Sequence, residues 1–264
     1  MGAKKLLDLF ARTFPEQHKP ADSTGDLILA RAGLVQPRKR RRRVSADTQP
    51  FNDCIAANST WSVDFKGQFE LGNHTLCYPL TVTDNFSRYL LLCQGLSSTR
   101  SSPVIAHFER LFEEFGLPWA IRFDNSAPFA STALGGISRL SKWWIDLGIR
   151  PERIKPAHPE QNGRHAFTNA IMNVLTKGLT VKHLRNATHT RHVYIRVYTG
   201  KIEPYDYGDG VHLRQVKGSG EIKWQGKTYY LSQVLAHEAV AFVPYADGVW
   251  HIFYRFHFLG QFDE

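Results

Sequence analysis

Two aspartates in this 264-residue chain stand where a carboxylate is costly to place. Asp64 lies inside an apolar run, and Asp124 directly follows Phe123 at the end of another. If the two runs are neighbouring strands, both side chains can surround a divalent cation such as Mg²⁺, which prefers oxygen ligands. Two such cations about 4 Å apart activate a water or a 3′-hydroxyl and stabilise the leaving oxygen of a phosphodiester. Spacing alone leaves a plainer interpretation open, in which Asp64 faces solvent and Asp124 forms a turn.

The elements around Asp64 are predicted to be three strands. Residues 61–65 alternate between apolar and polar types and put Asp64 on the face opposite its neighbours. Further strands are expected over residues 77–82 and 89–93, with a turn at Asp84 between them.

Helices and strands are expected to alternate after these three strands. An apolar stripe after Ser102, its expected N-cap, predicts a helix that ends at Gly116. A short strand is then expected over residues 120–123, and Asp124 follows it directly. The next expected elements are a helix over 139–147, a strand over 153–155, and a loop that leads into another helix at Arg164. This order predicts an α/β fold with a mixed sheet and flanking helices, which is the ribonuclease-H-like arrangement.

The N-terminal segment, residues 1–36, is expected to form two short helices. The first stops at Pro15, and the second has Asp22, Ser23 or Thr24 as its N-cap and ends at Gly33. Two helices joined by a turn suit a helix-turn-helix DNA reader, although the pair could equally be a fragment of a helical bundle.

A basic linker is expected over residues 37–50. The chain carries a formal net charge of +9, which favours a polyanionic partner such as DNA. This linker contains a dense run of consecutive basic residues. Such a run is typical of an extended arm that makes salt-sensitive phosphate contacts, and a solvated linker is the plainer alternative. The consecutive basic residues are Arg38, Lys39, Arg40, Arg41, Arg42 and Arg43.

The last part of the sequence changes character. Residues 181–210 show no consistent period and are expected to be an irregular connector. Residues 211–264 contain short aromatic-rich strands with glycine turns, and Asp247-Gly248 is a strong hairpin signal. This pattern predicts a small, separate all-β barrel.

The remaining features favour plain structural roles. Cys54, Cys77 and Cys93 lack paired metal-ligand spacing and are expected to be reduced thiols of an intracellular protein. No apolar run is long enough to cross a bilayer, and the start of the chain lacks the pattern of a secretory signal, so a cytoplasmic, nucleoid-associated protein without a membrane partner is expected. Trp143 and Trp144 are expected to pack in the core rather than stack on bases, and the loop residues His158 and His165 to be solvated.

Several motifs together resemble the integrase core of IS481-type transposases, within the wider group of retroviral-integrase-like DDE recombinases. The similarity is dense from about residue 50 to residue 165. Residues 2–43 also resemble the helix-turn-helix and basic linker of the family, and residues 220–264 resemble its C-terminal β-module. The motifs are Trp61-x-x-Asp64-Phe65-Lys66-Gly67, Tyr78-Pro79-Leu80-Thr81, Asp84-x-x-Ser87-Arg88-Tyr89, Arg122-x-Asp124-Asn125-x-x-Pro128-Phe129 and His158-Pro159-Glu160-Gln161-Asn162-Gly163-Arg164-His165.

The resemblance implies a ribonuclease-H-like core over residues 51–180 that transposes DNA with Mg²⁺ or Mn²⁺. Asp64 and Asp124 match the first two metal-binding carboxylates of the family. Lys66, Asn162 and Arg164 lie in the matching motifs and are expected DNA contacts. The family acts as a multimer, so a homo-oligomer on element ends and target DNA is expected.

The chain departs from the family pattern in ways that affect activity. The third acid follows the Asn-Gly-Arg-His stretch in the family, and that position is Ala166 here. Only about 45 residues separate Ala166 from Val211, so a segment is expected to be missing or replaced, and the start at Met1 suggests a shortened N-terminus. Ser126 stands where the family has glycine, which is expected to strain the turn after Asp124.

The sequence therefore predicts a transposase whose catalysis is impaired. Glu160 and Glu152 are poor substitutes for the third acid, because one lies in a proline-flanked loop and the other is further away. The alternative is a non-catalytic remnant that still binds DNA. A general ribonuclease-H-type nuclease is disfavoured, because the flanking modules suit the recognition of element ends.

Overall fold

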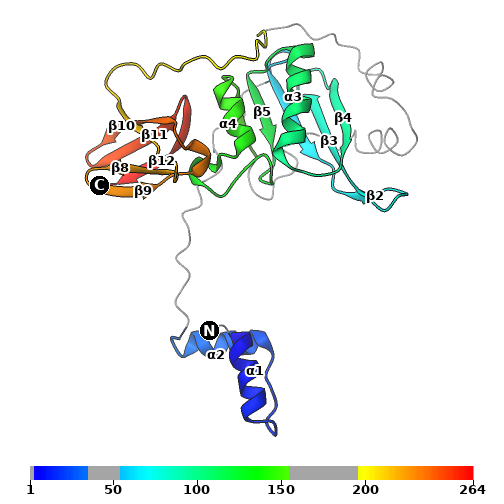
Figure 1. The fold of residues 1–264 in the computed structure, drawn as a ribbon, viewed down its shortest axis with the longest axis vertical. Helices are drawn as coiled ribbons and strands as arrows, with labels where there is room; N and C mark the ends of the chain where they lie inside the picture. The colour runs from blue at the N-terminus through cyan, green and yellow to red at the C-terminus, as the bar shows by residue number, and fades with distance from the viewer. Residues whose placement is uncertain (1–2, 35–53, 155–195, 264) are drawn as a thin grey trace. The chain divides into compact units, whose positions relative to one another are not determined.

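The computed structural model of the chain describes residues 3–34, 54–154 and 196–263. It divides into two compact units, Met1–Arg43 and Val44–Glu264 (Figure 1). The basic residues Arg38 to Arg43 and the predicted site residues Asn162, Arg164 and Ala166 lie outside the described residues, as do His158, Glu160 and His165.

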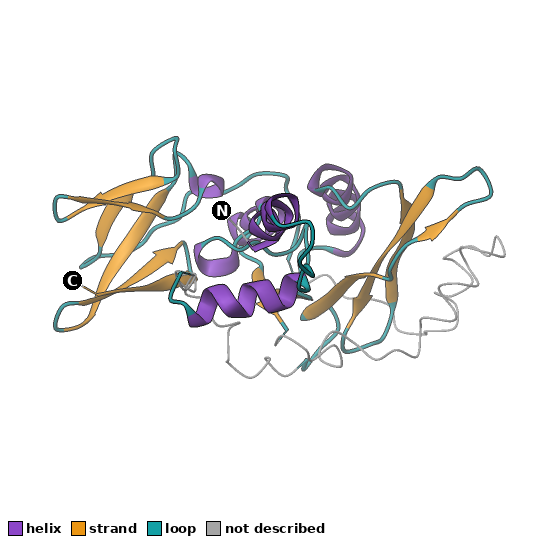
Figure 2. Ribbon diagram, turned by 90° about the horizontal axis from the view of Figure 1, so that it is seen from below, coloured by secondary structure: helices purple, strands orange, loops and turns teal. Residues whose placement is uncertain are grey.

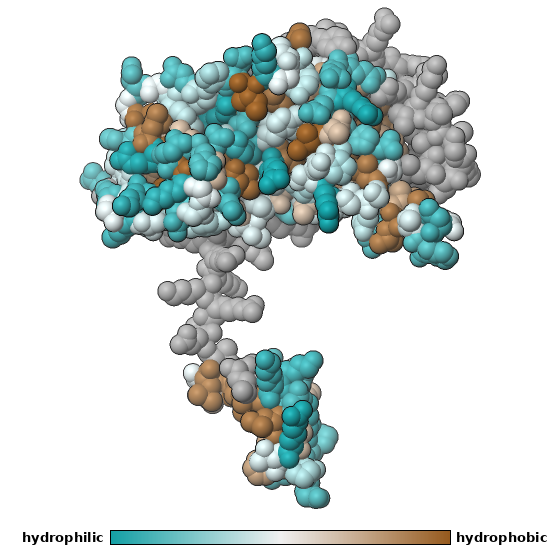
Figure 3. Space-filling view, in the orientation of Figure 1, coloured by the Kyte–Doolittle hydropathy of each residue, from teal (hydrophilic) through white to brown (hydrophobic). Residues whose placement is uncertain are grey.

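The first unit is a pair of helices, α1 (Ala3–Thr13) and α2 (Asp22–Arg31). The predicted N-cap is wrong, because Asp22 already begins the helix and its N-cap is Ala21, which makes no side-chain capping bond. Little apolar surface is buried: Leu7 packs on Gly25, and hydrophobic atoms remain at the surface of the pair (Figure 3). The exposed large apolar side chains of this unit are Leu9, Phe14, Leu27, Ile28 and Leu34.

The central sheet of the second unit has the predicted mixed direction. β1 pairs antiparallel with β3 and parallel with β5, β4 extends the sheet beyond β3, and β6 lies parallel beyond β5. The spatial order β4-β3-β1-β5-β6 is that of a ribonuclease-H-like sheet, with β2 as a short addition on β3. The strands are β1 (Thr60–Phe65), β2 (Phe69–Glu70), β3 (Leu76–Asp84), β4 (Leu90–Leu96), β5 (Ala120–Phe123) and β6 (Arg150–Arg153).

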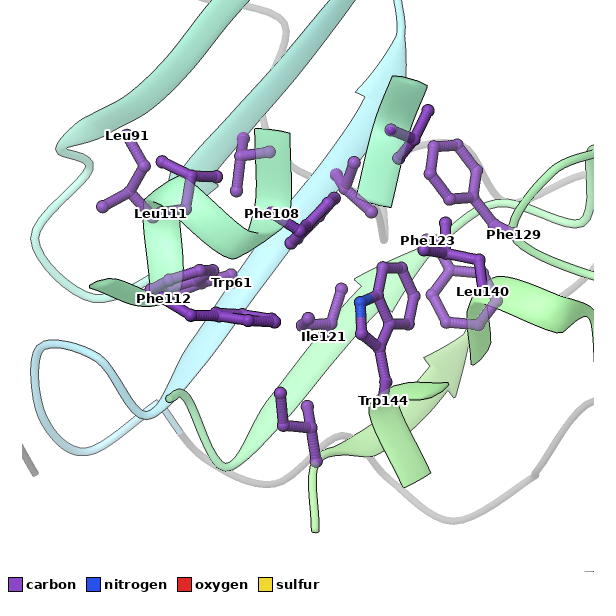
Figure 4. Close-up of a cluster of buried hydrophobic side chains, with 14 of the residues drawn as sticks. Trp61, Leu91, Phe108, Leu111, Phe112, Ile121, Phe123, Phe129, Leu140 and Trp144 are labelled. Carbon is purple, nitrogen blue, oxygen red and sulfur yellow. The ribbon is translucent and has the colours of Figure 1, made fainter. Parts of the chain in front are cut away.

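One face of this sheet is covered by α3 (Ser101–Phe115) and α4 (Arg139–Asp146). Figure 4 shows aromatic and aliphatic side chains of both helices against those of β1 and β5. Trp144 is fully buried among them, which confirms its predicted core role. The predicted cap of α3 is wrong, because Ser102 lies inside the helix and Arg100 precedes it without a side-chain cap. The predicted end at Gly116 is confirmed, where a φ of 74° suits glycine.

The other face of the sheet is polar. Cross-strand register places Ser62 beside Arg122, and Arg122 beside Glu152. Asp64 points to this same face, because residues two apart on a strand share a side. Both Ser62 and Glu152 are nonetheless buried.

The C-terminal region is all-β, as predicted. A four-stranded sheet in the order β12-β11-β10-β7 and a β8-β9 hairpin enclose one apolar cluster. The hairpin predicted at Asp247-Gly248 joins β10 to β11. The strands are β7 (His212–Gln215), β8 (Glu221–Trp224), β9 (Lys227–Tyr230), β10 (Ala239–Ala246), β11 (Val249–Tyr254) and β12 (His257–Asp263), drawn as orange arrows in Figure 2.

This β-module is not separate from the sheet domain, which corrects the sequence interpretation. Ile137 and Ile145, from the segment around α4, belong to the apolar cluster of the module. Beside them Asp146 accepts a hydrogen bond from the Tyr254 hydroxyl at 2.5 Å and pairs with Lys142 at 2.8 Å and Arg255 at 3.1 Å. No local pattern of residues predicts this cluster, because its members belong to segments that are distant in the chain.

Cys54, Cys77 and Cys93 form no disulfide bond within the described ranges. No helix in the described ranges is long and apolar enough to span a membrane.

Candidate active site

The sheet brings Asp64 and Asp124 together. β1 and β5 are neighbouring parallel strands whose paired register runs through Ser62 and Arg122. Asp64 and Asp124 each lie two positions beyond these partners, so they face each other across strands about 4.8 Å apart. Both side chains are partly exposed. The two carboxylates predicted from the sequence therefore lie near each other at the carboxyl ends of β1 and β5.

Asp64 is in an environment that disfavours its charge. Burial raises the pKa of this carboxyl, and the nearby charge of Asp124 raises it further. The ammonium of Lys66, which bonds to Asp64 Oδ2 at 2.7 Å, offsets the rise only in part. Lys66, expected from the sequence to contact DNA, is therefore engaged with the carboxylate in this structure.

Asp124 is held by the turn that follows it. The backbone N–H and the hydroxyl of Ser126 donate to Asp124 Oδ1 at 3.1 Å and 2.6 Å. The prediction of strain at Ser126 is wrong, because this residue is not among those with positive φ. Asn125 donates to the carbonyl of Ile154 at 2.9 Å and so fixes the turn to the end of β6. The serine thus orients the carboxylate instead of distorting the loop.

The donor set fits a hard divalent cation. Carboxylate oxygens are preferred ligands of Mg²⁺, which retains several waters and needs few protein groups. The Lys66 ammonium already places a positive charge against Asp64, so the position tolerates a cation. No group of three or more His, Cys, Asp or Glu side chains with metal-site geometry occurs in the described ranges. Asp64 and Asp124 would hold the ion, and the third family position, Ala166, lies outside those ranges.

Glu152 does not supply the third carboxylate. Its side chain is 7% exposed and accepts hydrogen bonds from Arg122 at 3.0 and 3.2 Å. Arg150 bonds to its other oxygen. Because both oxygens are engaged by guanidinium groups, Glu152 neutralises buried positive charge and stays out of the metal site.

Asp84, part of the family-like motif around Ser87, has a structural role. This fully buried carboxylate accepts from the Asn58 backbone at 2.8 Å and from the Ser87 backbone and hydroxyl at 2.7 and 2.6 Å. Asn58 in turn accepts from the indole N–H of Trp61 at 2.7 Å. The network fixes the β3–β4 turn to the start of β1, the strand that carries Asp64.

We expect Asp64→Asn to raise the free energy of unfolding at pH 7 when no metal is present. The folded pKa of Asp64 lies above the ordinary 3.8, so the folded chain binds this proton more tightly than the unfolded chain does. The stability from that proton is complete below the unfolded pKa and is lost as pH rises through the folded pKa. Asparagine does not titrate, so the Asp64→Asn variant loses no stability in this way as the pH rises. Urea denaturation in EDTA from pH 4 to pH 7 measures the difference, which should grow with pH.

Lys66→Gln is the matched control for this experiment. It removes the ammonium that lowers the pKa of Asp64, so stability should fall more steeply with pH than in the unaltered chain. A less stable Asp64→Asn at pH 7 would show that the pair with Lys66 outweighs the effect of burial.

The strand order and the paired aspartates define a ribonuclease-H-like domain. Residues 56–159 match the family model described as "Integrase core domain". The chain is also 29% identical over 170 residues to the insertion element IS476 uncharacterized 39.2 kDa protein of Xanthomonas euvesicatoria. That match covers 61% of this chain and 44% of the relative, so the chain spans less than half of the relative's length. Residues 56–159 are therefore similar to an integrase core domain, and the relative in sequence comes from an insertion element.

Solved structures with a similar arrangement are distant. The HTLV-2 integrase catalytic core in complex with magnesium, in its trimeric form, is 16% identical with a TM-score of 0.34, over 51% of this chain and 84% of that one. The simian T-cell lymphotropic virus intasome in complex with a PP2A regulatory subunit is 16% identical with a TM-score of 0.33, over 92% and 88%. The fold assignment rests on the strand order itself.

Proposed function

We propose that the chain is a DNA transposition protein of an insertion element, built for metal-dependent phosphodiester cleavage and strand transfer. The observation that carries the proposal is the convergence of Asp64 and Asp124 at one edge of the sheet of an integrase core domain. Mg²⁺ or Mn²⁺ held there would polarise the phosphodiester and lower the pKa of a bound water or hydroxyl.

The residues around the site have distinct parts in this proposal. Ser126 holds Asp124 Oδ1 through its hydroxyl and its backbone N–H and so orients this carboxylate. Lys66 neutralises Asp64 in the structure, and a cation held by Asp64 would leave its ammonium available to a DNA phosphate. The ion pair is therefore compatible with the proposed DNA-binding role of Lys66.

Catalysis in this chain is proposed to be impaired. Two carboxylates carry less negative charge than three, and an alanine at position 166 cannot coordinate a cation. Losses at metal sites and electrostatic sites are typically on the order of 100-fold. The second candidate function, favoured by Ala166, is a non-catalytic protein that binds DNA through residues 38–43, Asn162 and Arg164.

The partners follow from the same proposal. DNA, both element ends and target, is the proposed macromolecular ligand, and binding it would associate the protein with a bacterial nucleoid. The HTLV-2 relative is described in trimeric and dimeric forms, and a homo-oligomer is proposed here as well.

Strand transfer on labelled DNA ends tests the function. The unaltered chain and Asp64→Asn are compared with Mg²⁺ and Mn²⁺, while DNA binding is measured in parallel in EDTA. Weak product that disappears with Asp64→Asn supports an impaired enzyme. DNA binding without product in either metal supports the non-catalytic alternative, and absence of DNA binding contradicts both.

A further inference from the structure

Arg153, the last residue of β6, lies behind the turn that carries Asp124. It is the register partner of Phe123, the last residue of β5. Phe123 packs in the apolar cluster under α3 and α4 (Figure 4), so the side chain of Arg153 leaves the sheet on this helix-covered face. Asp124 is the next residue after Phe123 and points to the opposite face, which also carries Asp64. Any effect of Arg153 on the carboxylates must therefore pass through the turn between them.

Asn125 connects Arg153 to that turn. Nε of Arg153 donates to Asn125 Oδ1 at 3.0 Å, and Asn125 Nδ2 donates to the carbonyl of Ile154 at 2.9 Å. Because a guanidinium only donates and a carbonyl only accepts, the amide has one orientation that satisfies both partners. Asn125 stands between Asp124 and Ser126, which donates to Asp124 Oδ1 twice. The two bonds to β6 therefore hold the middle of the turn that orients the carboxylate.

The guanidinium is itself held from behind. Gly136 has a φ of 66°, and a Cβ built on it would lie 1.9 Å from Nη1 of Arg153, so a side chain at this position would displace the arginine. The adjacent Gly135 packs on Leu259 of β12, where a Cβ would lie 2.8 Å from Cδ2. Burial lowers the pKa of Arg153, so the charge is placed here against a cost of desolvation. The β-module thus backs the short turn on which the guanidinium rests.

We propose that Arg153 is a positioning residue for Asp124, which acts through Asn125 and keeps this carboxylate directed to the site that it shares with Asp64. The inference deepens the proposed function and rests on a divalent cation as the ligand of that site. Side chains that orient metal ligands typically contribute roughly 10- to 100-fold to metal affinity. The loss of the Arg153 bond is therefore expected to loosen the turn and to weaken cation binding together.

Two measurements on Arg153→Met, which removes every donor, test the proposal. Hydrogen exchange over residues 124–130, followed by mass spectrometry in EDTA, should become faster on the order of 10-fold, because the amides of Ser126, Phe129 and Ala130 donate within this turn. Mn²⁺ affinity, measured from the electron paramagnetic resonance signal of the free ion, should fall on the order of 10-fold. Arg153→Gln should retain most of both properties, because its amide nitrogen stands at the same place along the side chain as Nε and can donate to Asn125.

A double variant and a matched arginine separate positioning from general stability. If Arg153 acts through Asn125, Arg153→Met combined with Asn125→Ala should lose no more Mn²⁺ affinity than Asn125→Ala alone. The control is Arg196→Met, because burial also lowers the pKa of Arg196, which donates to three carbonyls near the starts of β5 and β6, away from the turn. This variant should unfold at a lower urea concentration and keep its Mn²⁺ affinity and its exchange over residues 124–130.

The outcomes distinguish this inference from the proposed function. Additive losses in the double variant, or exchange and Mn²⁺ affinity in Arg153→Met equal to those of the unaltered chain, overturn the role of Arg153. Absence of Mn²⁺ binding by the unaltered chain contradicts the proposed function instead, and exchange over residues 124–130 then decides whether Arg153 holds the turn. Circular dichroism verifies that each variant is folded. If Arg153→Met does not fold, Asn125→Ala breaks the same bond, and unchanged Mn²⁺ affinity in that variant overturns the proposal.

Discussion

Replacing Ala166 by glutamate is expected to raise Mg²⁺-dependent strand transfer on the order of 100-fold. The site now offers two carboxylates, Asp64 and Asp124, and a third would complete the charge needed to hold two dications. The effect should appear in product formation on labelled DNA ends, and Mn²⁺ should support more residual activity than Mg²⁺ in the unaltered chain, because Mg²⁺ demands the more regular coordination.

Ala166→Gln is the matched control, because it adds similar bulk without negative charge. It should leave strand transfer at the level of the unaltered chain, and Asp64→Asn should abolish whatever Ala166→Glu restores. Full activity in the unaltered chain, sensitive to Asp64→Asn, would show that another group already supplies the third ligand. No product from any variant that still binds DNA would favour the non-catalytic function.

Asp146→Ala is expected to lower the free energy of unfolding by about 3 kcal/mol. The carboxylate is 6% exposed, forms ion pairs with Lys142 and Arg255, and accepts a hydrogen bond from the hydroxyl of Tyr254. Burial opposes the charge of Lys142, but hydrogen bonds to Asp146, Glu238 and Tyr254 outweigh this effect and raise its pKa. Without Asp146, two partly buried cations and a buried hydroxyl each lose one acceptor. Urea denaturation at pH 7 measures the loss.

Two variants separate the buried carboxylate from its surroundings. Glu238→Ala also removes an acceptor of Lys142, at 2.7 Å, but its side chain is 37% exposed, so less than about 1 kcal/mol should be lost. Tyr254→Phe removes one hydrogen bond to Asp146 and should lower stability by about 1 kcal/mol. If Asp146→Ala were no worse than Glu238→Ala, the network would not hold the β-module against α4.

The sequence predicted those elements whose signals are local. Residues 139–147 carry a complete helical pattern, and α4 occupies Arg139–Asp146. Ser102 failed as a predicted cap because α3 already begins at Ser101, after Arg100, which makes no side-chain capping bond. The last strand of the sheet was expected over 153–155 but is Arg150–Arg153. Its polar residues and Pro151 conceal a strand that only the parallel register with β5 reveals.

The site was predictable in its carboxylates but not in the groups around them. Asp64 and Asp124 stand out because each interrupts or ends an apolar run. The bond from Arg153 to Asn125 joins residues 28 positions apart, and the bond from Tyr254 to Asp146 joins residues 108 positions apart. Such pairs depend on strand register and on how the β-module meets α4. No pattern in the amino-acid order encodes either one.

The packing of α1 on α2 has a thermodynamic consequence. Gly25 leaves so little room that a Cβ there would lie 2.7 Å from Leu7 Cδ1, so the helices can approach closely only with glycine at that position. Glycine within a helix costs about 1 kcal/mol relative to alanine, and Leu7 is the one large apolar side chain that the described part of this pair buries. The pair and the larger unit should therefore melt as separate transitions. Heat absorption by the whole chain would then be the sum of two curves, and a single Tm would not describe it.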